Sequence, residues 1–252
     1  MKPHERQAQM EQIVRQTGAV SVEILARRFD VSTETVRRDL GQLAEEGRVL
    51  KVHGGAKRPR LIVEGTFDVR NNRASDAKCH IGERAAVAVK PGEVLFVDTG
   101  STTLAAAEPL AAITGLTIIT NSWRFADRLA QAGSDATIHL LGGTYCSDNA
   151  ETIGPQTLAQ IGNYQADRAI ITVAAISHSI GAMDANFEEA AIARAMVTNS
   201  RDVIVLADSS KFGQRAGHLV CRSDDISLLI SDQQLDPTHR EAMTAMGVEI
   251  WT

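Results

Sequence analysis

The stretch Val31–Gly47, with the sequence VSTETVRRDLGQLAEEG, determines how the first part of this chain folds. It begins with small hydroxyl residues, which favour a helix N-terminus: Ser32, Thr33 and Thr35. Apolar residues then recur at i, i+4 and i+7 and share one helical face; they are Val36, Leu40 and Leu43. Two adjacent arginines, Arg37 and Arg38, point away from that face. The pattern predicts an amphipathic helix with a basic exposed side.

A shorter helix is predicted directly upstream, over Ser21–Asp30, and a tight turn at Asp30-Val31-Ser32 follows it. Helix, tight turn and helix is the helix-turn-helix arrangement, in which the second helix enters the major groove of DNA. The alternative is a surface helix with one buried stripe and a solvated charged face. The paired arginines, and a hydroxyl-rich N-terminus that can approach a phosphate closely, favour DNA binding. A first helix over Pro3–Gln16 completes a three-helix core.

The residues after this helix predict a small β-hairpin. Arg48–Ala56 alternates apolar and basic residues and contains the pair Gly54-Gly55. A hairpin directly after a recognition helix is a wing, so Lys51, His53 and the glycine backbone are candidates for contacts with a phosphate strand or the minor groove. His53 fits an ordinary exposed turn residue equally well.

Residues 5–57 resemble the DNA-binding domain of the DeoR-type family of bacterial sugar-catabolism repressors. The most specific part is Ser32-x-x-Thr35-Val36-Arg37-Arg38-Asp39-Leu40, followed by the wing His53-Gly54-Gly55. The resemblance implies a winged helix in which Asp39 orients an arginine or caps locally. The candidate DNA contacts are Ser32, Thr33, Thr35, Arg37, Arg38, Lys51, His53 and Gly54.

Charge is unevenly distributed along the chain. Residues 1–60 contain 12 Lys and Arg against 8 Asp and Glu, a net charge of +4, whereas the remaining residues carry −9 and the whole chain −5. A basic first fifth on an acidic body indicates that only the N-terminal part contacts a polyanion.

The composition is that of an ordinary globular protein. Of the 252 residues, 44% are hydrophobic and 23% are charged, which allows a small and a medium domain with an ample core. Three isolated cysteines argue against a disulfide framework or a zinc site and fit a reducing cytoplasm. Apolar runs such as Ala169–Ile176 are too short to span a bilayer, and the start MKPHERQAQ is unlike a signal peptide. We therefore expect a cytoplasmic protein that does not bind a membrane.

From Asp76 onward, short apolar strands alternate with helices. The predicted strands are Val94–Asp98, Thr117–Thr120, Ile138–Leu141, Ala169–Val173, Val203–Ala207, Ser227–Ile230 and Val248–Trp251. The predicted helices are Ala77–Val89, Thr103–Ala112, Trp123–Ala132, Thr157–Ile161, Glu188–Asn199 and Pro237–Met246. This alternation predicts an α/β domain with a mostly parallel, buried sheet. The expected organisation is a winged helix-turn-helix domain at 1–57, a polar linker at 58–75 next to the basic patch Lys57-Arg58-Pro59-Arg60, and an effector-binding domain at 76–252.

Polar residues follow several of these strands, at the edge where ligands of parallel sheets bind. Asp98-Thr99-Gly100-Ser101-Thr102-Thr103 comes after the first strand and offers hydroxyls and a helix N-terminus as a small phosphate cradle. Thr120-Asn121-Ser122 follows the second strand, Gly142-Gly143-Thr144 the third and Asp208–Gly213 the fifth; the last includes Lys211, where it can meet a phosphate. Any one such turn is equally well explained as a helix cap. Dinucleotide and nucleoside triphosphate motifs are missing from the sequence.

Residues 76–232 also resemble the DeoR-type effector domain, whose fold is related to sugar-phosphate isomerases. The resemblance rests on VDTGSTT (97–103), TNS (120–122), LLGG (140–143), Glu189-Ala190 and ADSSKFG (207–213). One departure is Thr172-Val-Ala-Ala-Ile-Ser177, which stands where the family usually shows a Gly-x-Asp-Gly-like turn. Asp184 and Glu189 either contact ligand hydroxyls or form salt bridges at helix starts. The candidate effector contacts are Asp98, Thr99, Gly100, Ser101, Thr102, Thr103, Asn121, Gly142, Gly143, Asp184, Glu189 and Lys211.

These observations favour a transcriptional repressor of a carbohydrate or polyol operon. We expect it to bind double-stranded operator DNA as a homodimer or homotetramer and to be released by a small phosphorylated sugar or polyol; release, as opposed to co-repression, is implied by the family. A sugar-phosphate isomerase or deaminase with an accessory DNA-binding domain is the alternative, but it needs a poised base, and the missing turn carboxylate counts against it. A DNA-bound scaffold without a ligand is disfavoured by the polar strand ends. No catalytic residue, cofactor or metal is expected.

Overall fold

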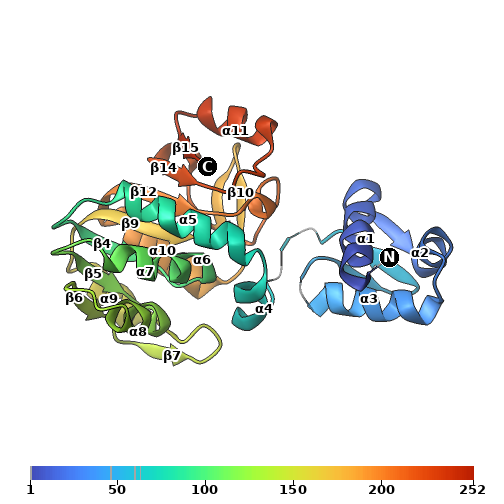
Figure 1. Cartoon of the computed structure of the whole chain (residues 1–252), viewed down its shortest axis with the longest axis horizontal. Helices are drawn as coiled ribbons and strands as arrows, with labels where there is room; N and C mark the ends of the chain where they lie inside the picture. Colours follow the sequence, from blue (N-terminus) through green and yellow to red (C-terminus); the bar gives the residue numbers. More distant parts are fainter. Residues whose placement is uncertain (1, 46, 60, 63) are drawn as a thin grey trace. The chain divides into compact units, whose positions relative to one another are not determined.

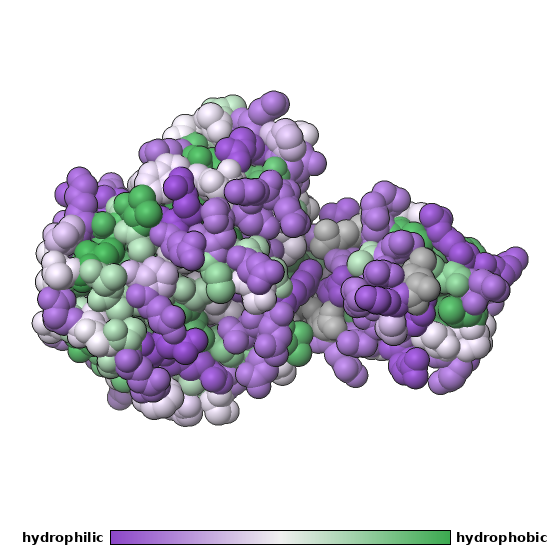
Figure 2. All heavy atoms as spheres, viewed as in Figure 1, coloured by the Kyte–Doolittle hydropathy of each residue, from purple (hydrophilic) through white to green (hydrophobic). Residues whose placement is uncertain are grey.

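The computed structural model of the chain describes residues 2–45, 47–59, 61–62 and 64–252. Arg60 of the predicted basic patch lies outside these ranges, as do Met1, Glu46 and Val63. The chain divides into two compact units, Met1–Val69 and Arg70–Thr252, called here the N-terminal and C-terminal units (Figure 1). On the face seen in Figure 2, hydrophilic residues predominate in both units and apolar areas are small and scattered.

The N-terminal unit is a three-helix core with a small antiparallel sheet, as the sequence predicts. Its elements are α1 (Pro3–Thr17), β1 (Ala19–Ser21), α2 (Val22–Phe29), α3 (Thr33–Glu45), β2 (Leu50–Val52) and β3 (Gly55–Lys57). The apolar faces of the helices meet in one core that includes Met10, Val14, Leu25, Val36, Leu40 and Leu43. The strands have the order β1-β3-β2, which makes a winged helix-turn-helix. Strand β1 was not predicted, because three residues are too few to show a period.

Local capping determines where α2 begins and ends and where α3 begins. The Ser21 hydroxyl accepts a hydrogen bond from the Ile24 N–H (3.3 Å) at the start of α2. Asp30 ends that helix in the left-handed conformation (φ 52°), which a short polar residue tolerates better than most. The Ser32 hydroxyl then accepts from the Thr35 N–H (3.2 Å) at the start of α3. The tight turn predicted from the sequence is therefore a helix end followed at once by a helix cap.

The segment predicted as a linker without regular structure contains a helix, α4 (Phe67–Asn72). The division between the two units falls inside it, between Val69 and Arg70. Six residues span fewer than two turns, so no apolar period distinguishes such a helix from a polar connection. The next helix, α5 (Ser75–Ala88), begins only three residues later.

The C-terminal unit is built on a parallel sheet of seven strands in the order β15-β14-β12-β9-β4-β5-β6. The strands are β4 (Val94–Val97), β5 (Thr117–Thr120), β6 (Thr137–Leu140), β9 (Ala166–Thr172), β12 (Ser200–Leu206), β14 (Leu228–Ile230) and β15 (Glu249–Trp251). All seven predicted strands are confirmed, with ends that differ by at most three residues. Because every pairing is parallel, all seven carboxyl ends lie along one edge.

Helices cover both faces of this sheet (Figure 1). They are α5, α6 (Ser101–Ala105), α7 (Ala107–Ala111), α8 (Trp123–Gln131), α9 (Pro155–Ile161), α10 (Phe187–Thr198) and α11 (Pro237–Thr244), with the short 3₁₀ turns η1 (Ser209–Lys211) and η2 (Ser223–Asp225). Alternate strand residues face opposite ways, so Leu95 and Val97 pack with α5, α7 and α8, whereas Phe96 packs with α9, α10 and α11. The single helix predicted over Thr103–Ala112 is wrong: it is two helices, because Pro109 has no N–H to donate to the preceding turn.

Two small antiparallel sheets complete the unit. One is the hairpin β7 (Thr144–Cys146) with β8 (Glu151–Ile153); the other has the order β10 (Ala175–Ser177), β11 (Gly181–Asp184), β13 (His218–Cys221). An isolated bridge joins Glu151 to Ser122, just after β5, and another joins Ile176 to Phe212, just after β12. Both small sheets therefore lie beside the carboxyl ends of the parallel strands.

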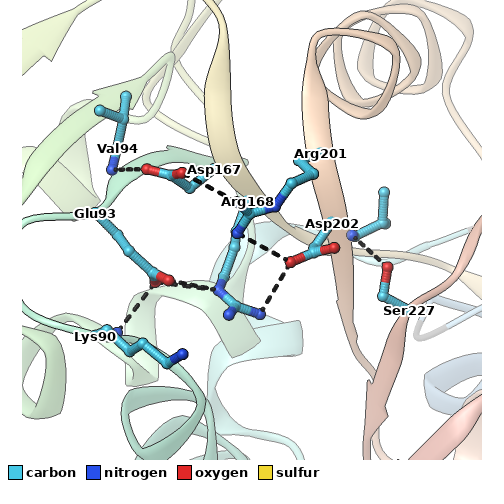
Figure 3. A network of polar contacts seen from close by, with 9 residues as sticks. Lys90, Glu93, Val94, Asp167, Arg168, Arg201, Asp202 and Ser227 are labelled. Atoms are coloured by element: carbon cyan, nitrogen blue, oxygen red, sulfur yellow. Dashed lines mark hydrogen bonds and ion pairs between the residues drawn. The ribbon is translucent and has the colours of Figure 1, made fainter.

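The opposite edge of the sheet is closed by charged groups (Figure 3). Arg168 near the start of β9 donates to Glu93 (Nε to Oε2, 3.0 Å) and lies 3.6 Å from Asp202 at the start of β12. Asp167 accepts from the Val94 N–H (2.9 Å). These bonds tie β4, β9 and β12 together at the edge away from the candidate site.

Candidate DNA-binding surface and effector site

The exposed side of α3 carries the predicted DNA contacts of the recognition helix. Val36, Leu40 and Leu43 are buried, whereas Ser32, Thr33, Arg37 and Arg38 are exposed. The side chains of Ser32 and Thr35 lie within hydrogen-bond distance of each other (Oγ to Oγ1, 2.9 Å). Arg37 lies 3.7 Å from Glu34 in an exposed i,i+3 pair, which is weak enough for the guanidinium to leave.

Asp39 is turned inward and links α3 to α1. Its carboxylate accepts from Arg6 (Nε to Oδ2, 2.6 Å) and Gln7 (Nε2 to Oδ1, 3.2 Å), and all three side chains are buried. Asp39 therefore orients an arginine, one of the two roles expected for it. A buried pair of this kind fixes one helix against the other, because breaking it leaves an uncompensated charge.

The wing presents Lys51 and His53 to solvent. Gly54 has a positive φ (76°), and its carbonyl accepts from the Val22 N–H (2.9 Å) at the start of α2. A Cβ on Gly55 would lie 2.3 Å from the Val20 carbonyl oxygen of β1. The glycine pair is thus required by the turn and by close strand packing, while Lys51 and His53 remain the candidates for DNA contacts on the wing.

A chain of hydrogen bonds joins polar side chains at the carboxyl edge of the large sheet. The Thr99 hydroxyl, after β4, donates to Asn121 (Oγ1 to Oδ1, 3.2 Å), after β5. Asn121 donates to Glu151 of β8 (Nδ2 to Oε2, 3.2 Å), and Asn149 donates to the other Glu151 oxygen (Nδ2 to Oε1, 2.9 Å). Sequence reasoning placed Thr99 and Asn121 together but missed Asn149 and Glu151, because the β7–β8 hairpin carries no recognisable signal.

Carboxyl groups crowd this site. Burial raises the pKa of Asp98 well above its usual value, and the charges of Glu151 and Asp184 raise it further, with Glu189 contributing least. Burial also raises the pKa of Glu151, against the hydrogen bond from Asn149 that lowers it. Asp98, Asp184 and Glu189, predicted from separate segments, are therefore close enough to interact electrostatically. Buried carboxyl groups with perturbed pKa values are typical of functional sites.

Cationic groups lie towards the end of β12. Lys78 of α5 is buried, and its Nζ donates to the Arg70 carbonyl. Burial lowers the pKa of Lys78 to about 8; the Asp208 charge opposes this, and the Lys211 charge adds to it. Lys78, Asp208 and Lys211 therefore gather at one place, although the sequence pointed only to the segment containing the last two.

Other predicted residues also have structural contacts. The Gly142 N–H donates to Gln160 (Oε1, 3.0 Å), and a Cβ on Gly143 would lie 2.1 Å from the Thr157 hydroxyl, so both glycines serve the packing of α9. A Cβ on Gly100 would lie 2.0 Å from Thr172 Cγ2, so its close approach is to β9. Ser101, Thr102 and Thr103 are buried, and the Thr103 hydroxyl caps the Gly100 carbonyl (3.0 Å).

A polar pocket of about 440 Å³ lies beside Asp208, at the start of α5. Its lining residues are Arg73, Ala74, Ser75, Asp76, Ala77, Asp208, Ser209, Ser210, Asp232 and Gln234. Two of them are already fixed, because Asp232 accepts from the Ser209 N–H (2.9 Å). Within the described ranges, no cluster of His, Cys, Asp or Glu side chains is arranged to hold a metal ion. Nor does any helix in the described part of the chain have the length and apolarity to cross a membrane.

Known protein families match both units. A model of the DeoR-like helix-turn-helix domain matches residues 6–60, and a model of the DeoR C-terminal sensor domain matches residues 73–233. The glycerol-3-phosphate regulon repressor of Escherichia coli K12 is 34% identical over 216 residues, covering 86% of this chain and 85% of that protein. The HTH-type transcriptional repressor GlcR of Bacillus subtilis 168 is 30% identical over 251 residues, covering 99% and 96%.

Solved structures are more distant. Ribose 5-phosphate isomerase A from Methanocaldococcus jannaschii aligns with a TM-score of 0.41 and 17% identity, over 55% of this chain and 54% of that one. A probable sor operon regulator from Shigella flexneri aligns with a TM-score of 0.43 and 13% identity, over 70% of this chain and 89% of that one. At these scores, nothing about activity follows from the likeness.

A winged helix-turn-helix joined to an α/β sensor domain defines a DNA-binding transcriptional regulator. The sensor-domain model alone covers more than half of the chain, and relatives named as repressors match it along most of their length. The chain belongs to the DeoR family of transcriptional regulators.

Proposed function

We propose that this protein is a repressor whose α3 and wing bind an operator, and whose C-terminal unit binds a phosphorylated sugar or polyol that releases it. The observation that carries the proposal is the separation of charge at the carboxyl edge of the sheet. Carboxylates and amides lie beyond β4 and β5 and at the start of β8, while Lys211 lies beyond β12. Such an edge suits a ligand with hydroxyls at one end and an anion at the other.

The hydroxyl end of the ligand is assigned to Asp98, Asn121, Asp184 and Glu189. Carboxylates and amide oxygens accept from sugar hydroxyls, and an ordered arrangement of acceptors selects the stereochemistry of a polyol. The anionic end is assigned to Lys211 and to the Thr99–Thr103 turn, whose helix N-terminus provides N–H groups. The name of one relative, the glycerol-3-phosphate regulon repressor, states a polyol phosphate regulon for that protein and supports the same chemical class here.

The operator-binding form is proposed to be a homodimer or homotetramer. One winged helix contacts only a few base pairs, so specific binding at physiological salt normally requires two modules on two half-sites. The DNA contacts are assigned to Thr33, Thr35, Arg37 and Arg38 on α3, with Lys51 and His53 on the wing.

A thermal-shift screen of the full chain tests the ligand class. The panel contains aldose, ketose, amino-sugar and polyol phosphates, including glycerol 3-phosphate, each beside its unphosphorylated counterpart. A ligand at 100 times its dissociation constant adds about 2.7 kcal/mol, which raises Tm by roughly 5–10 °C in a unit of this size. The expected result is a shift by one phosphorylated compound that its counterpart does not produce and that Lys211→Ala reduces.

Shifts that are equal for phosphorylated and unphosphorylated compounds contradict the assignment of an anionic end. A shift that Lys211→Ala leaves unchanged removes Lys211 from the site but not the ligand class. Inorganic phosphate serves as a control for the stabilising effect of anions in general.

A further inference from the structure

Helix α4 is where the chain passes from one unit to the other. Phe67–Val69 belong to the N-terminal unit, and Arg70–Asn72 belong to the C-terminal unit. A change in the contacts that the C-terminal unit makes with Arg70 therefore acts on α4, the helix that leads into the N-terminal unit.

Arg70 is held twice by the C-terminal unit. Its guanidinium donates to the amide oxygen of Asn149, 79 residues away in sequence, and its carbonyl accepts from the ammonium of Lys78. Asn149 and Lys78 are both buried, with relative exposures of 4% and 5%. One residue at the boundary is thus fixed through its side chain and through its backbone.

Both partners of Arg70 lead into the candidate effector site. Asn149 donates to Glu151 (Nδ2 to Oε1, 2.9 Å), whose other carboxylate oxygen accepts from Asn121 (Nδ2, 3.2 Å). Asn121 in turn accepts from Thr99 (3.2 Å). Lys78 interacts with Asp208 and Lys211, so the second partner leads to the cationic end of the site.

We propose that Arg70 is the positioning residue through which the effector site controls α4: its bonds to Asn149 and Lys78 hold α4 in the DNA-binding state, and effector binding breaks them. The inference rests on the function proposed above. It assigns Arg70, Asn149 and Lys78 the role of coupling the effector site to the DNA-binding surface.

The hydrogen-bond capacity of the network makes this mechanism physically reasonable. The side-chain amides of Asn121 and Asn149 each accept a hydrogen bond through the oxygen and donate one to Glu151 through the nitrogen. A ligand hydroxyl that bonds Glu151 therefore competes with one of these amide nitrogens. At the other end, Lys78 donates to a neutral carbonyl. A ligand anion is a stronger acceptor for an ammonium, because a charge-assisted bond is about twice as strong as a neutral one.

The test compares α4 in the full chain and in three variants, without any ligand. Arg70→Gln and Asn149→Ala remove the side-chain bond from opposite ends. Asn149→Asp keeps an oxygen acceptor for Arg70 and loses the donor to Glu151. Arg128→Gln is the control, because it removes the same charge from an exposed side chain of α8 that pairs with the exposed Glu108 (3.4 Å).

Hydrogen exchange of the α4 amides and operator titration are the two measurements. We expect Arg70→Gln and Asn149→Ala to speed exchange in α4 by roughly 10-fold or more and to weaken operator binding by about 5-fold or more. Asn149→Asp is expected to retain slow exchange in α4, and Arg128→Gln to match the parent in both measurements. Melting curves identify any variant that does not fold. If Asn149→Ala is one of them, Asn149→Asp is compared with Arg70→Gln in its place.

Unchanged α4 exchange in Asn149→Ala overturns the proposal, since the bond would then not hold the helix. Faster exchange with operator affinity within about 2-fold of the parent also overturns it, because Arg70 would then anchor α4 without controlling DNA binding. Both measurements are made without an effector, so they test the role of Arg70 separately from the identity of the ligand. Failure of every phosphorylated compound to release the parent from DNA contradicts the proposed effector and is a separate outcome.

Discussion

Arg37 and Arg38 are adjacent exposed arginines on the side of α3 opposite its buried stripe. Removing an arginine that contacts a base costs roughly 1–3 kcal/mol and relaxes specificity, whereas losing a phosphate contact weakens binding to all sequences alike. We predict that Arg38→Ala lowers affinity for an operator selected from random duplexes by about 10- to 100-fold, with nearly unchanged Tm. Fluorescence anisotropy at about 150 mM salt measures this. If Arg37→Ala and Arg38→Ala both bind like the parent, α3 is not the recognition helix.

Asp98 is a residue whose charge costs stability. Its pKa is raised by burial and by neighbouring carboxylates, so the folded state binds a proton more tightly than the unfolded state does. The penalty is present at neutral pH and is relieved as pH falls towards and below the raised pKa. Asp98→Asn keeps the oxygen that accepts from the Thr99 N–H (2.7 Å) and removes the charge.

We therefore predict that Asp98→Asn raises Tm at pH 7, weakens the dependence of stability on acidic pH and lowers effector affinity. Denaturation curves between pH 5 and 8 and ligand titration measure the three effects. A fall in Tm at pH 7 would show that the charge stabilises the fold, and would contradict the explanation of its pKa.

Among the elements, β4, β9 and β12 are tied together at the edge away from the candidate site. Arg168 bonds Glu93 and lies near Asp202, with the side chains of Arg168 and Glu93 only 15% and 11% exposed (Figure 3). Arg168→Met removes the arginine from these partly buried carboxylates. It leaves them with weaker partners, the Lys90 N–H for Glu93 (3.1 Å) and Arg201 for Asp202 (3.5 Å), which costs about 1–3 kcal/mol. We predict a Tm lower by roughly 2–12 °C with unchanged effector affinity. Loss of effector binding at a temperature where the variant is folded would contradict the separation of the two edges.

The elements also show where sequence reasoning succeeds. Hydrophobic patterns were sufficient to predict the seven parallel strands and the helix-turn-helix, because apolar runs and amphipathic stripes indicate which residues are buried. The strands β1, β7, β8, β10, β11 and β13 were missed because they belong to small antiparallel sheets outside the alternation of strands and helices that predicted the large sheet. Helix α4 was missed because it spans fewer than two turns, and Pro109 divided a helix that composition alone made continuous.

For the candidate site, residues could be grouped from the sequence alone where they directly follow a strand of the parallel sheet. Asp98, Thr99 and Asn121 could be grouped because each directly follows a parallel strand, and such ends share an edge. Glu151 and Asn149 could not, because they reach Asn121 only through a hairpin bridged to the end of β5. Lys78 and Arg70 lie before the first strand of the sheet, and only tertiary packing of α5 and α4 brings them there.

Across the whole molecule, two activities compete for the same site. Burial and neighbouring carboxylates raise the pKa of Asp98, and this is the observation that would favour an isomerase or deaminase. We predict no turnover: incubation with aldose, ketose and amino-sugar phosphates yields no isomer and no ammonia above background. Conversion of any one compound, lost in Lys211→Ala and in Asp98→Asn, would place an enzyme ahead of a ligand-binding regulator.

The two units are joined functionally only if a ligand in one changes the affinity of the other for DNA. Operator titration with and without a phosphorylated compound that shifts Tm, on the parent and on Lys211→Ala, measures this directly. We predict that the compound lowers the operator affinity of the parent by roughly 5- to 150-fold, the usual range of allosteric coupling. Lys211→Ala, whose DNA-binding unit is intact, should bind operator like the parent and stay bound at the same concentration. Equal operator affinity of the parent with and without every such compound would contradict control by a phosphorylated effector.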